Sequence, residues 1–172
     1  MFDKATPHLK TVLLADFQAL SAKAQGVARA RANLNLHPQL DDPVQRFLNA
    51  IEPGSYVRPH RHAEPQAKWE LFVVLSGAVA VLVLDEAGVV QERVVLDAAG
   101  DCRAVEIPAG AWHTLAALVA GTVLFECKQG PYQPASDKDF APWAPREGEA
   151  GAAALAARIA QADVGVALAE AA

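Results

Sequence analysis

The sequence predicts an all-β protein, an antiparallel barrel or sandwich with a helix near each end of the chain. Short segments rich in β-branched residues follow one another through the middle of the chain, separated by glycine, proline and acidic turn residues. No segment long enough for a crossover helix interrupts them, which argues against a parallel α/β sheet. Apolar residues recur at helical spacing near both ends of the chain.

Length and composition predict one globular domain. The chain has 172 residues, of which 52% are hydrophobic and 20% are charged. Its net charge of −5 provides no excess of cations, so we expect neither nucleic acid nor a membrane as a partner. The first ten residues lack the apolar core of a secretory signal, which predicts a cytoplasmic location. Cys102 and Cys127 have no metal-binding spacing and are expected to be reduced.

The N-terminal region, residues 1–36, is predicted to be a helix followed by an arm. Apolar residues at steps of three and four indicate a helix from Leu13 to about Ala30. Polar and apolar residues alternate from Arg29 to His37, so the polar side chains share one face if this stretch is extended. Prolines at 38 and 43 then indicate a turn.

A barrel with an irregular extension is predicted for residues 37–147. Its strands are expected at residues 44–51, 71–75, 79–84, 89–96, 105–107, 112–119 and 122–128. Four prolines between residues 129 and 145 predict an irregular segment that its aromatic residues hold on the barrel. The alanine-rich tail, residues 148–172, is predicted to form a terminal helix from residue 150.

Four side chains form a candidate metal site. His60 and His62 are two residues apart, so on an extended backbone both point to the same side. Glu70 opens the next apolar segment, and His113 follows a tight turn. Three imidazoles and one carboxylate suit one divalent metal ion, which could be Zn, Fe, Mn, Ni or Cu. Glu64 is the competing carboxylate, but the proline after it favours a loop there.

These residues resemble the two signature motifs of the cupin superfamily. The matching residues are Gly54, His60, His62, Glu70 and Gly77 in the first motif, and Pro108, Gly110 and His113 in the second. Seven residues separate His62 from Glu70, where three or four are typical, and Ala117 stands where many cupins carry Asn. The resemblance implies a double-stranded β-helix, or jelly-roll barrel, that holds a metal ion inside.

Further segments resemble the WbuC-type cupin-fold metalloproteins. They are residues 31–37, 42–47, 56–62, 68–70 and 130–145, within a likeness that runs from about residue 16 to residue 147. That family is associated with bacterial O-antigen gene clusters and has no assigned reaction. The resemblance therefore implies a role in lipopolysaccharide biosynthesis more weakly than it implies the fold and the metal.

One tyrosine and three charged residues near the motifs are candidates for catalysis or substrate binding. Tyr56 and Arg58 share the even-numbered face of His60 if the strand is regular, so Tyr56 is a catalytic candidate. Arg58 either clamps an anionic substrate or pairs with a nearby acid. Glu126 and Lys128 alternate with apolar residues along the last predicted strand. If they face inward, Glu126 is a candidate general base and Lys128 would shift its pKa. The cost of burying unpaired charge instead favours an outward-facing pair.

Polar residues of the arm and one tryptophan complete the candidates for substrate binding. Arg31, Asn33 and Gln45 either close the barrel mouth over a ligand or bond the arm to the barrel or to a second subunit, and the structural role is favoured. Trp112 stands beside His113, where an aromatic ring can contact a sugar, although packing is the favoured role for the tryptophans.

The leading functional prediction is a metal-dependent enzyme that acts on a small, carbohydrate-related molecule. Lewis-acid chemistry would allow isomerisation or hydrolysis, and with iron, dioxygen chemistry. The alternative is a metal-loaded binding or sensor module without turnover. A metal-free sugar-nucleotide epimerase ranks last, because it would use a His and Tyr pair. A homodimer is expected, since barrel edges often pair.

Overall fold

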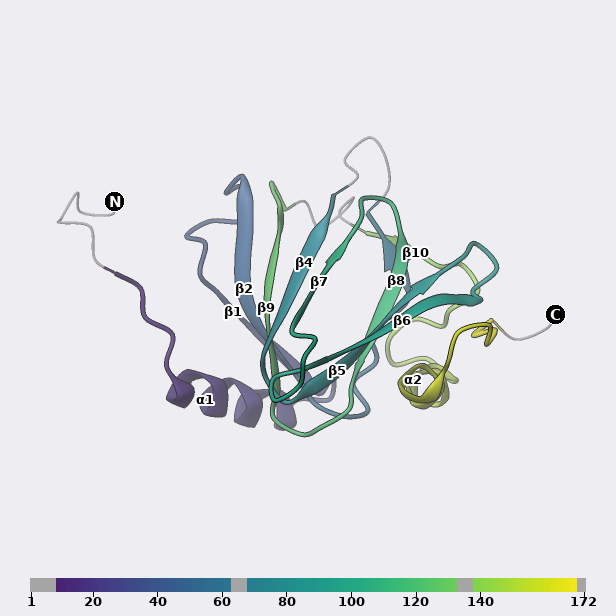
Figure 1. Ribbon diagram of the computed structural model, residues 1–172, viewed down its shortest axis with the longest axis horizontal. Helices are drawn as coiled ribbons and strands as arrows, with labels where there is room; N and C mark the ends of the chain where they lie inside the picture. The colour runs from purple at the N-terminus through teal and green to yellow at the C-terminus, as the bar shows by residue number, and fades with distance from the viewer. Residues whose placement is uncertain (1–8, 63–67, 133–137, 170–172) are drawn as a thin grey trace.

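The strands pair into two antiparallel sheets that face each other, with one helix packed on the outer side of each (Figure 1). The computed structural model describes residues 9–62, 68–132 and 138–169. This arrangement is the cupin jelly roll, and it confirms the predicted all-β class with a helix near each end. No helix in these three ranges is long and apolar enough to cross a membrane.

Each sheet contains five strands. Sheet A consists, in spatial order, of β1 (Arg31–Asn35), β2 (Val44–Ile51), β9 (Thr122–Gln129), β4 (Glu70–Ser76) and β7 (Ala104–Ile107). Sheet B consists of β10 (Asp139–Phe140), β3 (His60–Arg61), β8 (Trp112–Ala117), β5 (Ala78–Leu84) and β6 (Val90–Asp97). The helices are α1 (Leu14–Gln25) and α2 (Ala152–Gln161).

Alternation along the strands separates an inner face from an outer face in both sheets. The outer face of sheet A packs Leu48 and Val123 against Leu20 and Ala24 of α1. The outer face of sheet B packs against α2 through a cluster that includes Leu82, Trp112, Ala116, Leu155 and Ile159. Between the sheets lies an apolar core that includes Phe72, Val79, Val81, Leu115 and Leu124. Polar residues occupy the inner face at the other end of the barrel, described below.

A buried carboxylate ties α1 to the barrel. Glu52 is 6% exposed and follows β2 directly. It accepts hydrogen bonds from the Ser21 hydroxyl on α1 and from the Gly121 N–H, at 3.1 Å, in the turn between β8 and β9. Because one donor belongs to α1 and the other to the barrel, Glu52 holds the helix in place on the sheet.

The first helix is shorter than predicted, and the arm after it forms a strand. The helix ends at Gln25 instead of near Ala30, because Gly26 caps it with an N–H donated to Ala22 O at 3.2 Å. Ala30 then adopts a left-handed φ of 51°, which turns the chain into β1. Every residue of β1 pairs with β2, from Arg31 opposite Ile51 to Asn35 opposite Phe47.

The tail is helical over only part of the predicted range. The helix α2 ends where Ala162 takes an extended conformation, and Gly165 has a φ of +86°. The following residues run beside β6, where Val166 O accepts a hydrogen bond from Val90 N at 2.9 Å. The sequence did not predict β3 and β10, because two-residue strands are too short to show a period.

Candidate metal centre and adjoining pocket

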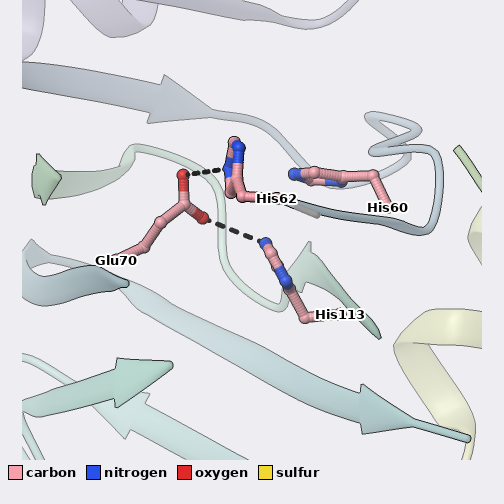
Figure 2. Close-up of side chains that lie close together, drawn as sticks. All are labelled: His60, His62, Glu70 and His113. Carbon is pink, nitrogen blue, oxygen red and sulfur yellow. Dashed lines mark hydrogen bonds and ion pairs between the residues drawn. The ribbon is translucent and has the colours of Figure 1, made fainter. Parts of the chain in front are cut away.

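The four predicted metal ligands converge in the interior of the barrel. Figure 2 shows the Glu70 carboxylate between His62 and His113, with His60 beside them. The potential donor atoms of these four buried residues all lie within 4.8 Å of one another. Glu70 is the first residue of β4 in sheet A, whereas His60 and His113 lie on β3 and β8 of sheet B. The cluster therefore joins the two sheets.

Strand register explains why the histidines meet. His60 and His113 are directly opposite each other in the antiparallel β3–β8 pair, so their side chains point to the same face, and their ring centroids are 4.3 Å apart. His62 follows β3 two residues after His60. Gly110 has a φ of +79° in the turn before β8, a conformation that glycine adopts without strain. That turn sets where His113 enters the strand.

Backbone carbonyls fix the tautomers of two of the rings. His60 Nδ1 lies 2.9 Å from Arg58 O, and His113 Nδ1 lies 2.9 Å from Ala111 O. A carbonyl oxygen only accepts, so both Nδ1 atoms carry the hydrogen, and each neutral ring presents a lone pair at Nε2. His60 Nε2 is buried and has no hydrogen-bond partner among the described residues. Burial, followed by the charges of Lys138 and His113, lowers the pKa of His60 well below its usual value, which keeps the ring neutral.

The carboxylate faces two imidazoles. Glu70 Oε1 is 2.9 Å from His62 Nε2, and Oε2 is 3.0 Å from His113 Nε2. Burial by itself raises the pKa of Glu70, but the contacts with His113 and His62 and the charge of Lys128 hold that pKa well below its usual value. A carboxylate oxygen therefore faces the lone pair of His113, and two acceptors at this distance repel unless a proton or a cation lies between them.

The four residues thus fit a divalent metal ion. They offer lone pairs at buried nitrogens, an ionised carboxylate and backbone partners that orient the rings, which are the features of a metal-ligand set. Three nitrogens and one oxygen do not select one ion among Zn, Fe, Mn and Ni. Glu64, the alternative carboxylate, lies outside the described residues.

A polar pocket of about 270 Å³ adjoins this cluster. Its wall is formed by residues of β1, β2 and β9 in sheet A and by residues that flank these strands. The residues that line it include Arg31, Asn33, Gln45, Asn49, Glu126 and Lys128. Register places them together, because Gln45 and Glu70 both lie opposite Lys128, on either side of β9. The structure therefore brings together five predicted candidates, Arg31, Asn33, Gln45, Glu126 and Lys128.

Glu126 and Lys128 face inward, contrary to the outward-facing pair that the cost of burial favoured. They are only 6% and 4% exposed. Lys128 Nζ is 3.2 Å from Glu70 Oε1 and 3.8 Å from Glu126 Oε1, so the buried charges are paired. Asn49 Nδ2 also donates to Glu126 Oε2 at 3.4 Å. Burial, followed by the charge of Glu70, raises the pKa of Glu126 to about 7, although Lys128 opposes the shift.

Three predicted candidates do not line this pocket. Tyr56 and Trp112 belong to the apolar cluster between sheet B and α2. Trp112 precedes His113 on β8, and consecutive strand residues point to opposite faces. The Tyr56 hydroxyl donates to Pro145 O at 2.9 Å, and burial raises the pKa of Tyr56 to about 12. Arg58 donates to Ala144 O and Ala141 O at 3.0 and 3.1 Å, and it forms no ion pair with an acid within the described residues.

The even-numbered face that was expected to unite Tyr56, Arg58 and His60 does not exist, because residues 52–59 form no strand. The pocket lining also contains residues outside the predicted site residues, and Asn49 and His37 are two of them. Asn49 has the same strand parity as Gln45, and His37 has the same parity as Arg31 and Asn33 along the arm. Strand parity was therefore the signal that identifies both.

Comparison with known proteins assigns no activity to this chain. Residues 13–96 match a family model described as a domain of unknown function, DUF6016. No curated protein is significantly similar to this chain. The strand order and the clustered motif residues define a protein of cupin fold with a buried His/Glu cluster that could bind a metal ion.

Several solved structures are similar over part of their length. KdgF from Halomonas sp. is 19% identical over 61% of this chain and 82% of its own, with a TM-score of 0.46. An oxalate oxidase in complex with the substrate analogue glycolate is 19% identical over 67% of this chain and 57% of its own, with a TM-score of 0.47. The cupin domain of Cnp3 from Schizosaccharomyces pombe is 12% identical over 58% of this chain and 64% of its own, with a TM-score of 0.44. This chain thus spans less than two thirds of the last two, and the fold assignment rests on its own strand order.

Proposed function

We propose that the protein is a metal-dependent enzyme that acts on a small polar molecule derived from a carbohydrate. The observation that carries the proposal is the buried set of His60, His62, Glu70 and His113 beside a polar pocket in the barrel. Lys128 links the two, since it lines the pocket and its ammonium lies 3.2 Å from Glu70. A ligand in the pocket is thus separated from the candidate metal centre by one side chain.

A divalent ion held by these ligands would supply Lewis acidity for isomerisation or hydrolysis. The chain itself supplies a group for proton transfer. Glu126 lines the pocket, and its raised pKa of about 7 lets its carboxyl group exchange a proton near neutral pH, as a general acid or base requires. Asn49, which donates to Glu126 Oε2, orients this carboxyl group. Lys128 stabilises its ionised form.

The substrate class and the cellular role rest on two different supports. The guanidinium of Arg31 and the amide of Asn33 provide donors that suit hydroxyl and carbonyl oxygens of a sugar derivative, whereas the Gln45 amide nitrogen already donates to Leu40 O and Asp42 O. The resemblance to WbuC-type proteins supports a role in O-antigen metabolism. A cytoplasmic location, expected from the N-terminal sequence, and a homodimer, expected from the pairing of barrel edges, are parts of the same proposal.

Metal analysis of the purified protein tests the first part. We expect close to one divalent ion per chain in the wild type, and its loss in His60→Ala and His113→Ala with the circular dichroism spectrum of a folded barrel retained. His37→Asn is the matched control, because it removes a buried imidazole outside the cluster and should keep the ion. Full metal content in both alanine variants would contradict the proposed ligand set.

Turnover is tested separately with a panel of sugars, sugar acids and sugar phosphates. The proposal predicts conversion that chelation abolishes and that the added ion restores. Binding without conversion across the panel would instead favour the non-catalytic binding or sensor module. Conversion by the metal-free protein would favour the epimerase.

A further inference from the structure

His37 lies in the wall of the pocket with one ring nitrogen unpaired. The side chain is 5% exposed, and its ring lines the same pocket as Lys128 and Glu126. His37 Nε2 is buried and has no hydrogen-bond partner in the described part of the chain. Buried polar atoms in folded proteins are nearly always paired, so an unpaired one at a pocket wall points to a partner outside the described residues, such as a ligand.

The other nitrogen of the ring fixes its tautomer. His37 Nδ1 lies 3.0 Å from the backbone N of Arg46 and 2.9 Å from its carbonyl oxygen. That oxygen already accepts hydrogen bonds from the backbone N–H groups of Leu36 and His37, at 2.8 and 3.2 Å. The N–H and C=O of one strand residue point to the same side, so the Arg46 N–H faces β1 and not β9.

His37 Nδ1 is therefore the acceptor for the Arg46 N–H, and the neutral ring carries its hydrogen at Nε2. This tautomer is the opposite of the one that the backbone imposes on His60 and His113, where Nδ1 is the donor. The metal-ligand rings thus present lone pairs, whereas His37 presents a hydrogen-bond donor. A donor at the wall of a pocket requires an oxygen or another acceptor on the ligand.

The charges around the pocket select the kind of acceptor. Four cationic side chains line the pocket, and Glu126 is the one acidic side chain among the described lining residues. The cations are Arg29, Arg31, Lys128 and Lys138. Glu147 accepts from Arg29 at 2.9 Å and from Arg31 at 2.8 Å, which holds both guanidinium groups in place. These cationic groups attract an anionic ligand, although Glu147 offsets part of the charge of the arginines, and Glu70 and Glu126 offset part of the charge of Lys128.

We infer that the pocket recognises a small hydroxylated anion, a sugar acid or a sugar phosphate, and that His37 donates a hydrogen bond from Nε2 to one of its oxygens. This inference rests on the proposed function, because it names the ligand class of the same site. The cationic side chains account for the negative charge of the ligand. The amide groups of Asn33 and Asn49 account for its hydroxyl groups.

Calorimetric titration of the metal-loaded wild type with three probes tests the ligand class. The probes are D-glucuronate, D-glucose 6-phosphate and neutral D-glucose. We expect at least one anion to bind about 10-fold or more tightly than glucose, and comparison of the two anions distinguishes a carboxylate from a phosphate ligand. Binding of glucose as tight as that of both anions, or no binding of either anion, would overturn the inference.

Two substitutions test the donor role of His37 Nε2 and the acceptor role of His37 Nδ1 separately. In His37→Asn, the side-chain oxygen replaces Nδ1 as acceptor for the Arg46 N–H, but no donor reaches the place of Nε2. In His37→Gln, the side-chain amide replaces the Nε2 donor, but the Arg46 N–H loses its partner. We expect His37→Asn to weaken binding of the anion about 10- to 100-fold with little loss of stability. His37→Gln should show the reverse.

Controls distinguish failure of this inference from failure of the proposed function. Gln91→Ala, an exposed position on β6 of the other sheet, should bind the anion like the wild type. Metal content is measured in every variant, and its absence from the wild type would contradict the proposed function itself. Unchanged anion binding in a metal-loaded His37→Asn would overturn only the role of His37. Nitrogen-15 spectra of the imidazoles should show the proton at Nε2 of His37, and a proton at Nδ1 would also overturn it.

Discussion

Replacement of Lys128 by methionine should destabilise the metal-free protein strongly. Lys128 is 4% exposed, and its ammonium group lies between two buried carboxyl groups, 3.2 Å from Glu70 and 3.8 Å from Glu126. Methionine has nearly the same length and fills the same space, so the substitution mainly removes the charge. The two carboxyl groups then remain in the barrel without this cation between them.

The size of the effect follows from these distances. At an effective dielectric constant of about 20, unit charges 3.2 and 3.8 Å apart attract by about 5 and about 4 kcal/mol. The cost of removing the ammonium from water on folding offsets much of this attraction in the wild type. Loss of one partner from a buried ion pair costs roughly 3 to 5 kcal/mol of unfolding free energy, and we expect a loss in this range.

Urea unfolding with a chelator present measures this loss at pH 7.5. We expect the midpoint to fall and the slope of the unfolding free energy against urea to stay constant. Lys23→Met, on an exposed turn of α1, is the matched control and should leave the midpoint unchanged. A loss below about 1 kcal/mol in Lys128→Met would refute the reasoning, because it would show that the buried carboxyl groups do not depend on this cation.

Two further predictions concern Glu126 and Glu52. The folded state raises the pKa of Glu126 from 4.5 to about 7, so the metal-free wild type should lose stability as the pH rises through this window, by at most about 3 kcal/mol. Glu126→Gln should remove that part of the pH dependence. If the urea midpoints of the variant and of the wild type change with pH in the same way between pH 5 and 8, the raised pKa of Glu126 is contradicted. Glu52→Gln should lower the unfolding free energy by about 1 to 3 kcal/mol, since it weakens the bonds from Ser21 and Gly121. A midpoint equal to that of wild type would show that Glu52 does not hold α1 in place.

Local signals predicted most of the strands and the residues of the candidate metal centre. The strand Val44–Ile51 was predicted to the residue, because Pro43 before it and a Glu-Pro-Gly turn after it limit regular structure. The four residues of the candidate metal centre were predicted from the His-x-His spacing, from the turn before His113 and from their likeness to the cupin motifs, and the structure brings them together. Both predictions therefore relied on features that residues close together in the sequence determine.

Side-chain orientation that depends on pairing between distant strands was not predictable in the same way. Alternation in β9 shows that Glu126 and Lys128 share a face, but only the pairing of Lys128 with Glu70 on β4 shows that this face is the inner one. The prediction that Tyr56 and Arg58 share a face with His60 was wrong, because it applied strand alternation to residues that form no strand. The tautomer of His37 depends on Arg46, which comes beside it only when β1 and β2 pair.

The interior of the barrel changes character along single strands. On β9, Leu124 belongs to the apolar core between the sheets, whereas Glu126 and Lys128, two and four residues later on the same face, line the pocket. One end of such a strand is held by apolar contacts, and the other end is held by paired charges. An exchange of residues at the pocket end therefore leaves the contacts of Leu124 intact, but a buried charge such as Lys128 can be replaced at low cost only together with its partners.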